Sequence, residues 1–289
     1  MSSACEKSGR DDAPLYLGGD VRSVIQTDEG RKGWDALMGC PERAVLLWDL
    51  NGATLELAPP GGFPQLDPDV CRELPRMGAR YAFNGILTGW AHSQVSEIGL
   101  AVPNCHVWGQ LASEHWDWRT QTRHELVAPS SGLSMAHAKL HKVVQALRLD
   151  TECIYAKSHS LAFLYPVDTD RGVVEQLLGE LGEIAEAAGD LTLLQDRGFV
   201  KLAPAGLDKK VALQRILDEC VPFEPSVIMN AGDMPDRVIM DELDRRRRED
   251  GTPTLKVGVR NLRDGVDLFV PGPPRGVLPF IRALGGASV

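Results

Sequence analysis

The chain has 289 residues, and its 40 acidic against 31 basic side chains give it a formal net charge of −9. A chain longer than about 250 residues usually divides its hydrophobic core, so we expect two domains or one domain with a large insertion. Hydrophobic residues make up 43% of the chain and charged residues 25%, which argues against a disordered, fibrous or disulfide-based protein. The acidic surplus argues against binding to nucleic acid or to an anionic membrane.

The apolar segments and the cysteines predict the cellular compartment. No segment approaches 18 consecutive apolar residues, as a membrane span would need, and the N-terminus has no apolar signal core. The six cysteines include no CxxC pair and no metal-like spacing, so we expect reduced thiols. These features together predict a cytoplasmic protein.

The first part of the chain predicts alternating strands and helices. Residues 1–40 are polar and Gly-rich, which predicts a flexible extension with one short helix. The apolar run 44–48 ends at Asp49 and predicts a strand buried on both faces of a parallel sheet. Later elements are expected as a helix from Asp67, a strand at 80–83 ending at Asn84 and Gly85, a helix at 91–100 and a strand at 106–109.

The middle of the chain predicts a different organisation. Its expected elements are a hairpin at 117–128, helices at 136–147 and 173–188, and strands at 161–165, 191–194 and 199–202. Alternation then resumes with a helix at 209–219, a strand at 226–229, a helix at 238–248, a strand at 254–257 and a helix at 276–284. We therefore expect an α/β fold, with a Rossmann-like parallel-sheet core (41–116 and 204–289) and an inserted α+β cap domain (117–203).

Polar side chains follow the predicted strands where ligands bind in an open α/β sheet, at the carboxyl ends. They are Asp49 and Asn51 after the first strand, Asn84 after the second, Asp233 and Asp236 after a later one, and Lys209 at the start of the preceding helix. Carboxylates bind Mg²⁺, and lysine binds phosphate oxygens. The pattern predicts a site for a divalent cation and a phosphoryl group. The alternatives are a turn cap for Asp49 and caps of the helix near Val238 for the two later aspartates.

Four motifs, in order, resemble those of the haloacid dehalogenase (HAD) superfamily. They are WDLNGAT, AFNG, LDKKVALQRIL and NAGDMPD, and the usual forms are hhhhDxDGT, hhhS/T, a lysine at a helix start and GDxxxD. VWGQLASEHW, YAKSHSLAFLY and FVKLAPAGLDKKVAL are similar to stretches of trehalose-6-phosphate phosphatases and related sugar phosphatases. The resemblance implies the HAD core with its cap and a Mg²⁺-dependent phosphatase.

The resemblance also implies a role for each motif residue. Asp49 attacks phosphorus and forms an aspartyl-phosphate, which water then hydrolyses. The metal ligands are Asp49, the backbone carbonyl of Asn51, Asp233 and Asp236. Phosphate is bound by Asn84, Gly85 and Lys209.

Asn51 departs from the family pattern at the residue that does acid-base work. The family has an aspartate there, and an amide cannot exchange a proton at a useful pKa. Three explanations stay open: a natural loss of activity, an engineered trap for a ligand, or a proton supplied by another group such as His115. Asn84 in place of Ser or Thr, Ile86 in place of Arg and an acidic motif shortened by one residue are further departures.

The cap residues depart from the trehalose-phosphate pattern. Lys157 keeps the family lysine, but Tyr155 and Lys201 stand where glutamates grasp sugar hydroxyls. An ammonium group cannot accept hydrogen bonds as a carboxylate does. We therefore expect His115, Tyr155, Lys157 and Lys201 to bind a related sugar, cyclitol or glycoside phosphate from small-molecule or secondary metabolism, and not trehalose 6-phosphate. The alternatives are exposed strand lysines and a structural histidine.

Two further functions stay open. The first is a catalytically impaired or non-catalytic HAD-like protein that binds a phosphorylated ligand or a partner enzyme, and Asn51 favours it. The second is phosphoryl or glycosyl transfer on the same fold, because a fold alone does not determine function.

Overall fold

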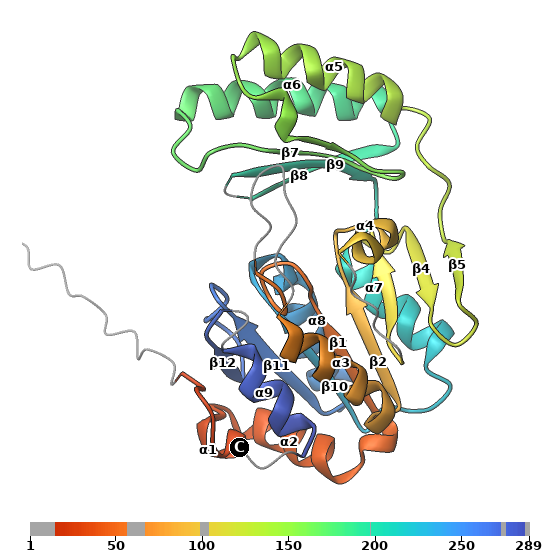
Figure 1. The fold of residues 1–289 in the computed structure, drawn as a ribbon, viewed down its shortest axis with the longest axis vertical. Coiled ribbons are helices and arrows are strands. Elements are labelled where there is room, and N and C mark those ends of the chain that lie inside the picture. Colours follow the sequence, from red (N-terminus) through yellow and green to blue (C-terminus); the bar gives the residue numbers. More distant parts are fainter. Residues whose placement is uncertain (1–14, 57–66, 99–103, 197, 273–275, 287–289) are drawn as a thin grey trace, which may run out of the picture.

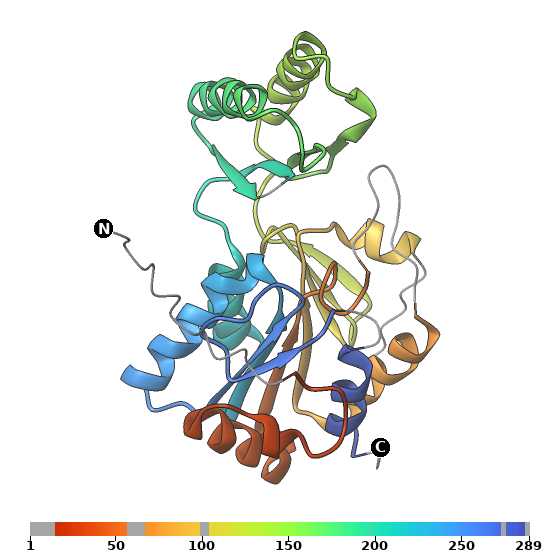
Figure 2. The same ribbon diagram turned by 90° about the vertical axis from the view of Figure 1, so that its left-hand side faces the viewer.

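The computed structural model describes residues 15–56, 67–98, 104–196, 198–272 and 276–286 (Figure 1). They form a core, in which helices cover both faces of a large sheet, and a cap, in which two helices cover one face of a smaller sheet (Figures 1 and 2). Among the described helices, none combines the length and the apolar character needed to cross a membrane. The predicted fold class, a mostly parallel α/β core with an inserted α+β cap, is confirmed.

The core sheet has β1 near its centre. Its strands in spatial order are β12 (Leu268–Val270), β11 (Thr254–Val259), β10 (Val227–Gly232), β1 (Ala44–Trp48), β2 (Phe83–Leu87), β3 (His106–Gly109), β4 (Glu114–Asp117) and β5 (Thr122–Glu125). The first six are parallel to their neighbours, and β4 and β5 extend the sheet antiparallel. Because β1 lies between β10 and β2, the carboxyl ends of these three strands meet at one edge of the sheet.

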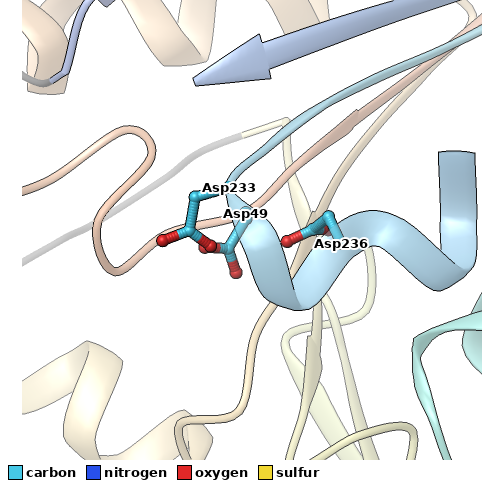
Figure 3. Close-up of side chains that lie close together, drawn as sticks. All are labelled: Asp49, Asp233 and Asp236. Carbon is cyan, nitrogen blue, oxygen red and sulfur yellow. The ribbon is translucent and has the colours of Figure 1, made fainter. Parts of the chain in front are cut away.

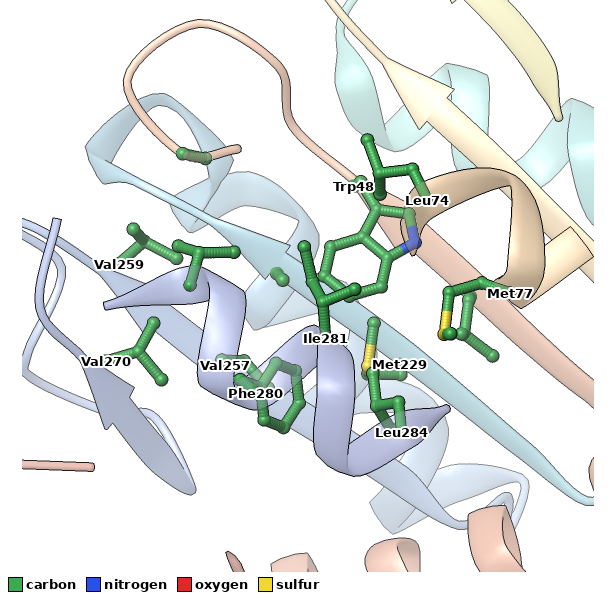
Figure 4. Packing of buried hydrophobic residues seen from close by; sticks show 14 of the residues in the cluster. Trp48, Leu74, Met77, Met229, Val257, Val259, Val270, Phe280, Ile281 and Leu284 are labelled. Carbon is green, nitrogen blue, oxygen red and sulfur yellow. The ribbon is translucent and has the colours of Figure 1, made fainter. Parts of the chain in front are cut away.

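Helices bury both faces of this sheet, as the apolar run of β1 requires. On one face lie α2 (Asp28–Gly39), α3 (Pro68–Arg80) and α9 (Val277–Leu284), and on the other α7 (Lys209–Arg215) and α8 (Arg237–Glu249). Trp48 packs with Leu74 and Phe280 in the first of these cores (Figure 4). The remaining core helices and turns are α1 (Val21–Val24), α4 (His92–Glu97), two 3₁₀ turns (Pro41–Arg43 and Met234–Asp236) and a π turn (Ile216–Cys220).

The predicted flexible extension is wrong from residue 15 onward. Residues 21–24 and 28–39 form α1 and α2, and α2 packs against β11 and β10. Trp34 and Leu37 lie buried in the core, so this segment completes one face of the sheet. Residues 1–14 lie outside the described residues.

The second strand lies further along the chain than predicted. β2 runs from Phe83 to Leu87, and Asn84 pairs with Leu46 in the interior of β1. The prediction that this strand ends at Asn84 and Gly85 is therefore wrong. Asn and Gly usually interrupt strands, but here the Asn84 amide is hydrogen-bonded inside the core, to Trp48 and to the Leu74 carbonyl.

The cap consists of α5 (Leu133–Ala146), α6 (Arg171–Ala188) and a four-stranded antiparallel sheet. In spatial order its strands are β6 (Ile154–Ala156), β7 (Leu161–Leu164), β9 (Phe199–Pro204) and β8 (Leu191–Asp196), and a 3₁₀ turn (Thr151–Cys153) precedes β6. The hairpin predicted at 117–128 exists, but β5 pairs with β4 of the core sheet. The second sheet and its helices therefore begin later in the chain than residue 117.

Candidate active site

Three aspartates from two neighbouring strand ends converge at the carboxyl edge of the core sheet (Figure 3). Asp49 directly follows β1, and its backbone N–H donates to the Ala231 carbonyl of β10 at 2.9 Å. Asp233 follows β10, and Asp236 ends the 3₁₀ turn that leads into α8. Each carboxylate offers an oxygen within 4.8 Å of the others, and all three residues are buried.

The turn after β10 requires a glycine at position 232. A Cβ atom there would lie 2.3 Å from Cγ of Asp236, which is closer than two carbon atoms can approach. Gly232 thus allows Asp236 to fold back against the strand end. This close packing places two carboxylates of the shortened acidic motif in one site.

Lys209 joins two of the aspartates. Its Nζ donates to Asp49 Oδ1 and to Asp236 Oδ2, each at 2.6 Å. Lys209 is the first residue of α7, whose N-cap Asp208 accepts a hydrogen bond from the Val211 N–H. The helix start therefore holds the ammonium group in position between the strand ends.

The carboxylates of the acidic motif do not cap a helix. Asp236 occupies the N-cap position of α8 without a side-chain capping hydrogen bond, and Asp233 precedes the 3₁₀ turn in the same way. The alternative that Asp233 and Asp236 only cap the helix is therefore wrong. Asp49 binds Lys209 and also accepts a hydrogen bond from the backbone of Leu50, so it can hold the turn and still belong to the site.

Burial raises the proton affinity of the carboxylates. It raises the pKa of Asp49 to about 6, an effect that Asp236 adds to and Lys209 opposes. Burial, with the nearby charge of Asp49, also raises the pKa of Asp233 to about 6. Burial lowers the pKa of Lys209, but Asp236 and Asp49 outweigh it and hold that pKa above its ordinary value. The negative charge of the three aspartates thus exceeds the positive charge of Lys209 at neutral pH.

Arg260 is a site residue that the sequence analysis missed. Its Nη2 donates to Asp233 Oδ2 at 2.6 Å, whereas Asp233 Oδ1 is buried and has no hydrogen-bond partner among the described residues. No motif in the sequence indicates Arg260. It directly follows β11, and its own backbone is in the left-handed region, with a φ of 56°. A buried carboxylate oxygen without a partner, beside two further carboxylates, fits a hard divalent cation with oxygen ligands.

Asn51 lies at the same sheet edge, two residues after Asp49. It forms a bridge with Leu55 in a tight loop, in which Gly52 has a φ of 85° and the Thr54 hydroxyl donates to the Asp49 carbonyl at 2.9 Å. The loop is ordered by its own hydrogen bonds, so position 51 is held close to the strand end.

Asn84 and Gly85 are not brought to this edge. Both lie inside β2, and the Asn84 Oδ1 accepts from Trp48 Nε1 at 2.9 Å in the buried core. Their predicted phosphate contacts are therefore not supported. The hydroxyl residue that follows β2 is Thr88, which is buried and accepts from the Trp90 N–H. Part of the signal was present, because Ile86-Leu87-Thr88 matches the last three positions of the pattern hhhS/T.

His115 is also not brought to the carboxylates. It lies in β4, which β2 and β3 separate from β1. Its Nε2 and His106 Nδ1 lie 2.9 Å apart, and its ring stacks on Trp108. Burial lowers the pKa of His115 to about 4, so the ring is neutral at pH 7. These contacts support the alternative that His115 is a structural histidine.

The cap presents Tyr155 and Lys201 toward the core. Tyr155, Ala162 and Lys201 are neighbours across β6, β7 and β9, so their side chains share one face of the sheet. The opposite face packs against α5 and α6 through Leu161, Phe163, Val200 and Leu202. The helices lie on the side away from the core (Figure 1), so the row that contains Lys201 faces the site.

Two cap lysines reach the core. Lys157 Nζ donates to the Gly89 carbonyl at 2.8 Å, and Lys201 Nζ donates to the same oxygen at 3.4 Å. Lys201 is only 4% exposed, so the alternative of an exposed strand lysine is wrong for this residue. Gly89 follows Thr88 beyond the end of β2, so both ammonium groups lie at the carboxyl edge of the core sheet.

Replacing Lys201 with methionine should stabilise the protein. Burial, with the nearby charges of Lys157 and Lys209, holds the pKa of Lys201 well below its ordinary value. A buried donor with poor compensation costs about 1–3 kcal/mol, and Lys201→Met removes that cost in nearly the same volume. Urea unfolding at pH 7 should show a higher free energy of unfolding for Lys201→Met than for the unaltered chain. This difference should shrink as the pH rises, because Lys201 in the unaltered chain then loses its proton. A loss of stability would contradict the burial argument.

Gln110 connects the cap to the core and Glu114 supports Gln110, and the sequence analysis selected neither residue. Gln110 donates to Ser158 Oγ at 2.8 Å and accepts from the His159 N–H at 3.0 Å. Glu114 accepts from Gln110 and pairs with Arg123 Nε at 2.7 Å. Both belong to VWGQLASEHW, and Gln110 has a positive φ of 48°, a strain that such contacts offset.

Solved structures with a similar fold exist, although neither a protein-family model nor a curated protein sequence matches the chain. The chain is similar to the C-terminal domain of trehalose-6-phosphate phosphatase from C. albicans, with 15% identity, a TM-score of 0.72 and coverage of 91% of this chain and 98% of that one. It is also similar to the C-terminal domain of the Candida albicans trehalose synthase regulatory protein, with 12% identity, a TM-score of 0.63 and coverage of 93% and 99%.

A third similar structure is a haloacid dehalogenase-like hydrolase from Bacteroides thetaiotaomicron, with 12% identity, a TM-score of 0.54 and coverage of 83% of this chain and 99% of that one. At such identities the likeness concerns the fold. The chain has the HAD fold, with a core and cap arranged as in the trehalose-6-phosphate phosphatases. The resemblance that the motif order indicated is thereby confirmed for the fold.

Proposed function

We propose that the chain is a Mg²⁺-dependent phosphatase that hydrolyses a phosphomonoester of a sugar-like small molecule. The observation that carries the proposal is the buried cluster in which Lys209 lies 2.6 Å from both Asp49 and Asp236, with Asp233 beside them. A carboxylate nucleophile, a lysine and further carboxylates at one strand edge can do phosphoryl-transfer chemistry. The HAD fold, shared with phosphatases, supports the same interpretation.

Asp49 is the nucleophile in this proposal. Its carboxylate oxygen forms a bond to phosphorus while the bond from phosphorus to the leaving oxygen breaks, which leaves an aspartyl-phosphate. Water then attacks the phosphorus, releases phosphate and regenerates the carboxylate. Lys209 holds one oxygen of Asp49 and balances the negative charge of the phosphoryl group.

Asp49, Asp233 and the backbone carbonyl of Asn51 would hold Mg²⁺, and Asp236 supports the site through Lys209. Bound there, the ion would neutralise charge between the nucleophile and the phosphoryl group. The unpartnered oxygen of Asp233 supports this assignment. Asp236 is a further ligand in this proposal, because its Oδ2 contacts Lys209 while its Oδ1 is buried without a hydrogen-bond partner among the described residues.

The test of the function is phosphate release from a panel of sugar, cyclitol and glycoside phosphates, with Mg²⁺. Asp49→Asn should abolish release from every ester, because an amide does not form the acyl phosphate. Lys142→Met on the exposed side of α5 is the matched control and should leave the rate unchanged. Silence of the unaltered chain and of Asn51→Asp on the whole panel would contradict the proposal, and so would equal rates with and without Asp49. Preferential hydrolysis of trehalose 6-phosphate would contradict the expected substrate class.

Mg²⁺ should stabilise the protein in a pH-dependent way. The pKa values of Asp49 and Asp233 are raised to about 6, above their ordinary 3.8, so without metal these groups favour folding most at low pH. That contribution is lost as the pH rises from about 4 to 6. Mg²⁺ binds the charged carboxylates, and at a hundredfold excess over its Kd it contributes about 2.7 kcal/mol.

Thermal unfolding with and without Mg²⁺ measures this effect. The rise in Tm should be larger at pH 7.5 than at pH 5, because protons compete for the ligands, and Asp233→Asn should remove most of it. A rise that is independent of pH, or that survives Asp233→Asn, would place the ion elsewhere.

A second candidate function is a catalytically impaired or non-catalytic protein that binds a phosphorylated ligand or a partner. Asn51 favours it, because the residue next to the nucleophile cannot protonate a leaving group. One protein of similar fold is described as a regulatory protein, so a role of this kind is compatible with the fold.

A further inference from the structure

Two lysine side chains of the cap share a single backbone oxygen. Lys157 and Lys201 both donate to the Gly89 carbonyl, at 2.8 and 3.4 Å. Their ammonium groups are therefore close neighbours, and the charge of Lys157 helps burial to lower the pKa of Lys201. One carbonyl oxygen does not compensate two ammonium charges.

These lysines lack the counter-charge that Lys209 has. In the described part of the chain, no carboxylate lies within 4 Å of either ammonium group, whereas Lys209 has two at 2.6 Å. The charge of Glu114 raises the pKa of Lys157, yet burial outweighs it and lowers that pKa to about 8. Lys201 is buried and Lys157 is partly buried, and an anion between the two groups would compensate positive charge for which the described residues supply no carboxylate within 4 Å.

The pair lies on the cap side of the phosphoryl site, close enough for the charge of Lys209 to act on Lys201. Lys201 and Ala162 are cross-strand neighbours on the sheet face that is turned toward the core, and Tyr155 continues the row. The carboxylates, Lys209 and the strand ends form the phosphoryl site on the core side. A substrate whose phosphate occupies the core site would place its leaving group beneath this row.

We propose that the leaving group of the substrate carries a second anionic group, a carboxylate or another phosphate, which Lys157 and Lys201 bind. The proposal rests on the proposed phosphatase function for the position of the first phosphate. An ammonium group only donates hydrogen bonds, so the pair is suited to an anionic acceptor and gives little to a neutral sugar. The substrate class is therefore an acidic sugar or cyclitol phosphate.

Equilibrium binding measured by calorimetry, with Mg²⁺, tests the proposal independently of turnover. The probes are glucose 6-phosphate, 6-phosphogluconate, fructose 1,6-bisphosphate and inorganic phosphate. We expect at least one of the two probes with a second anion to bind about tenfold or more tightly than glucose 6-phosphate, because its second anion pairs with two ammonium groups that have no carboxylate within 4 Å in the described part of the chain. The tighter of the two identifies the second anion as carboxylate or phosphate.

Lys201→Met should abolish this preference, so that neither probe with a second anion binds more tightly than glucose 6-phosphate. The exposed Lys142→Met is the control and should keep the preference. Equal binding of all three esters by the unaltered chain would overturn the proposal. So would a Lys201→Met variant that weakens inorganic phosphate and every ester alike, because the lysine would then bind the phosphoryl group.

The outcomes separate this inference from the proposed hydrolysis. A preference for the second anion that depends on Lys201, without phosphate release from any ester, supports the anion site and contradicts the hydrolysis. Phosphate release from esters with an uncharged leaving group, with no effect of Lys201→Met on selectivity, supports the hydrolysis and contradicts the anion site.

Discussion

Replacing Lys209 with methionine should destabilise the protein by about 3–5 kcal/mol, the cost of leaving buried charges without their partner. Lys209 is the shared partner of Asp49 and Asp236, at 2.6 Å from each, and is itself only 5% exposed. Without its charge the two carboxylates repel each other in a buried site, where water screens them poorly. Urea unfolding of Lys209→Met at pH 7.5 measures the loss, and phosphate release should disappear with it.

The matched comparison is Lys201→Met, a second buried lysine that lies close to the same site. The two lysines are almost equally buried, but Lys209 has two carboxylates and Lys201 only a carbonyl oxygen. The same substitution should therefore change stability in opposite directions. The loss in Lys209→Met should also narrow near pH 5, where the aspartates take up protons. Equal effects of the two substitutions, or a loss that does not depend on pH, would contradict this account.

Replacing Asn51 with aspartate should raise the rate of phosphate release by about 10²–10⁴, the usual contribution of a general acid-base group. Position 51 lies two residues after Asp49 in a loop that its own hydrogen bonds order, so a carboxyl group there is placed to protonate the leaving oxygen. Single-turnover and steady-state rates on the best ester of the panel measure the gain. Asn51→Ala is the control, because it also lacks a proton to give and should not be faster than the unaltered chain.

The result distinguishes the explanations for Asn51. A large gain indicates that the acid-base group was lost or removed, whether in nature or by design. Equal and substantial rates in both forms indicate that another group supplies the proton. His115 is a poor candidate for that role, because burial lowers its pKa to about 4 and its ring contacts His106 and Trp108.

The short-range sequence patterns correctly predicted the site residues that directly follow a strand or begin a helix. Asp49 follows a continuous apolar run, and such a run is buried on both faces only in a parallel sheet covered by helices. Asp233 and Lys209 follow from the same alternation of strand and helix. The sequence analysis placed Asn84 wrongly because Asn and Gly often end a strand. In the structure the Asn84 side chain accepts a hydrogen bond from the Trp48 indole inside the core.

Long-range contacts determined the residues that the patterns missed. Arg260 meets Asp233 and Gln110 meets His159 only when distant segments come together. The cap boundary was also misjudged, because a hairpin has the same alternation on either sheet, and only the pairing of β5 with β4 assigns it to the core. Residues 21–39 looked polar, yet Trp34 and Leu37 complete the core.

The sequence by itself determined the α/β fold with its cap and the place of Asp49 at a strand end. It also shows an amide at position 51 and a lysine at position 201, where the resembled family has acidic residues. The fold and the strand ends depend on residue type and on short-range periodicity, and the two departures depend on the order of the motifs. The tertiary structure alone decided that Lys209 balances two carboxylates while Lys157 and Lys201 share one carbonyl oxygen. Charge compensation depends on distances and burial between segments far apart in the chain, so no local pattern contains it.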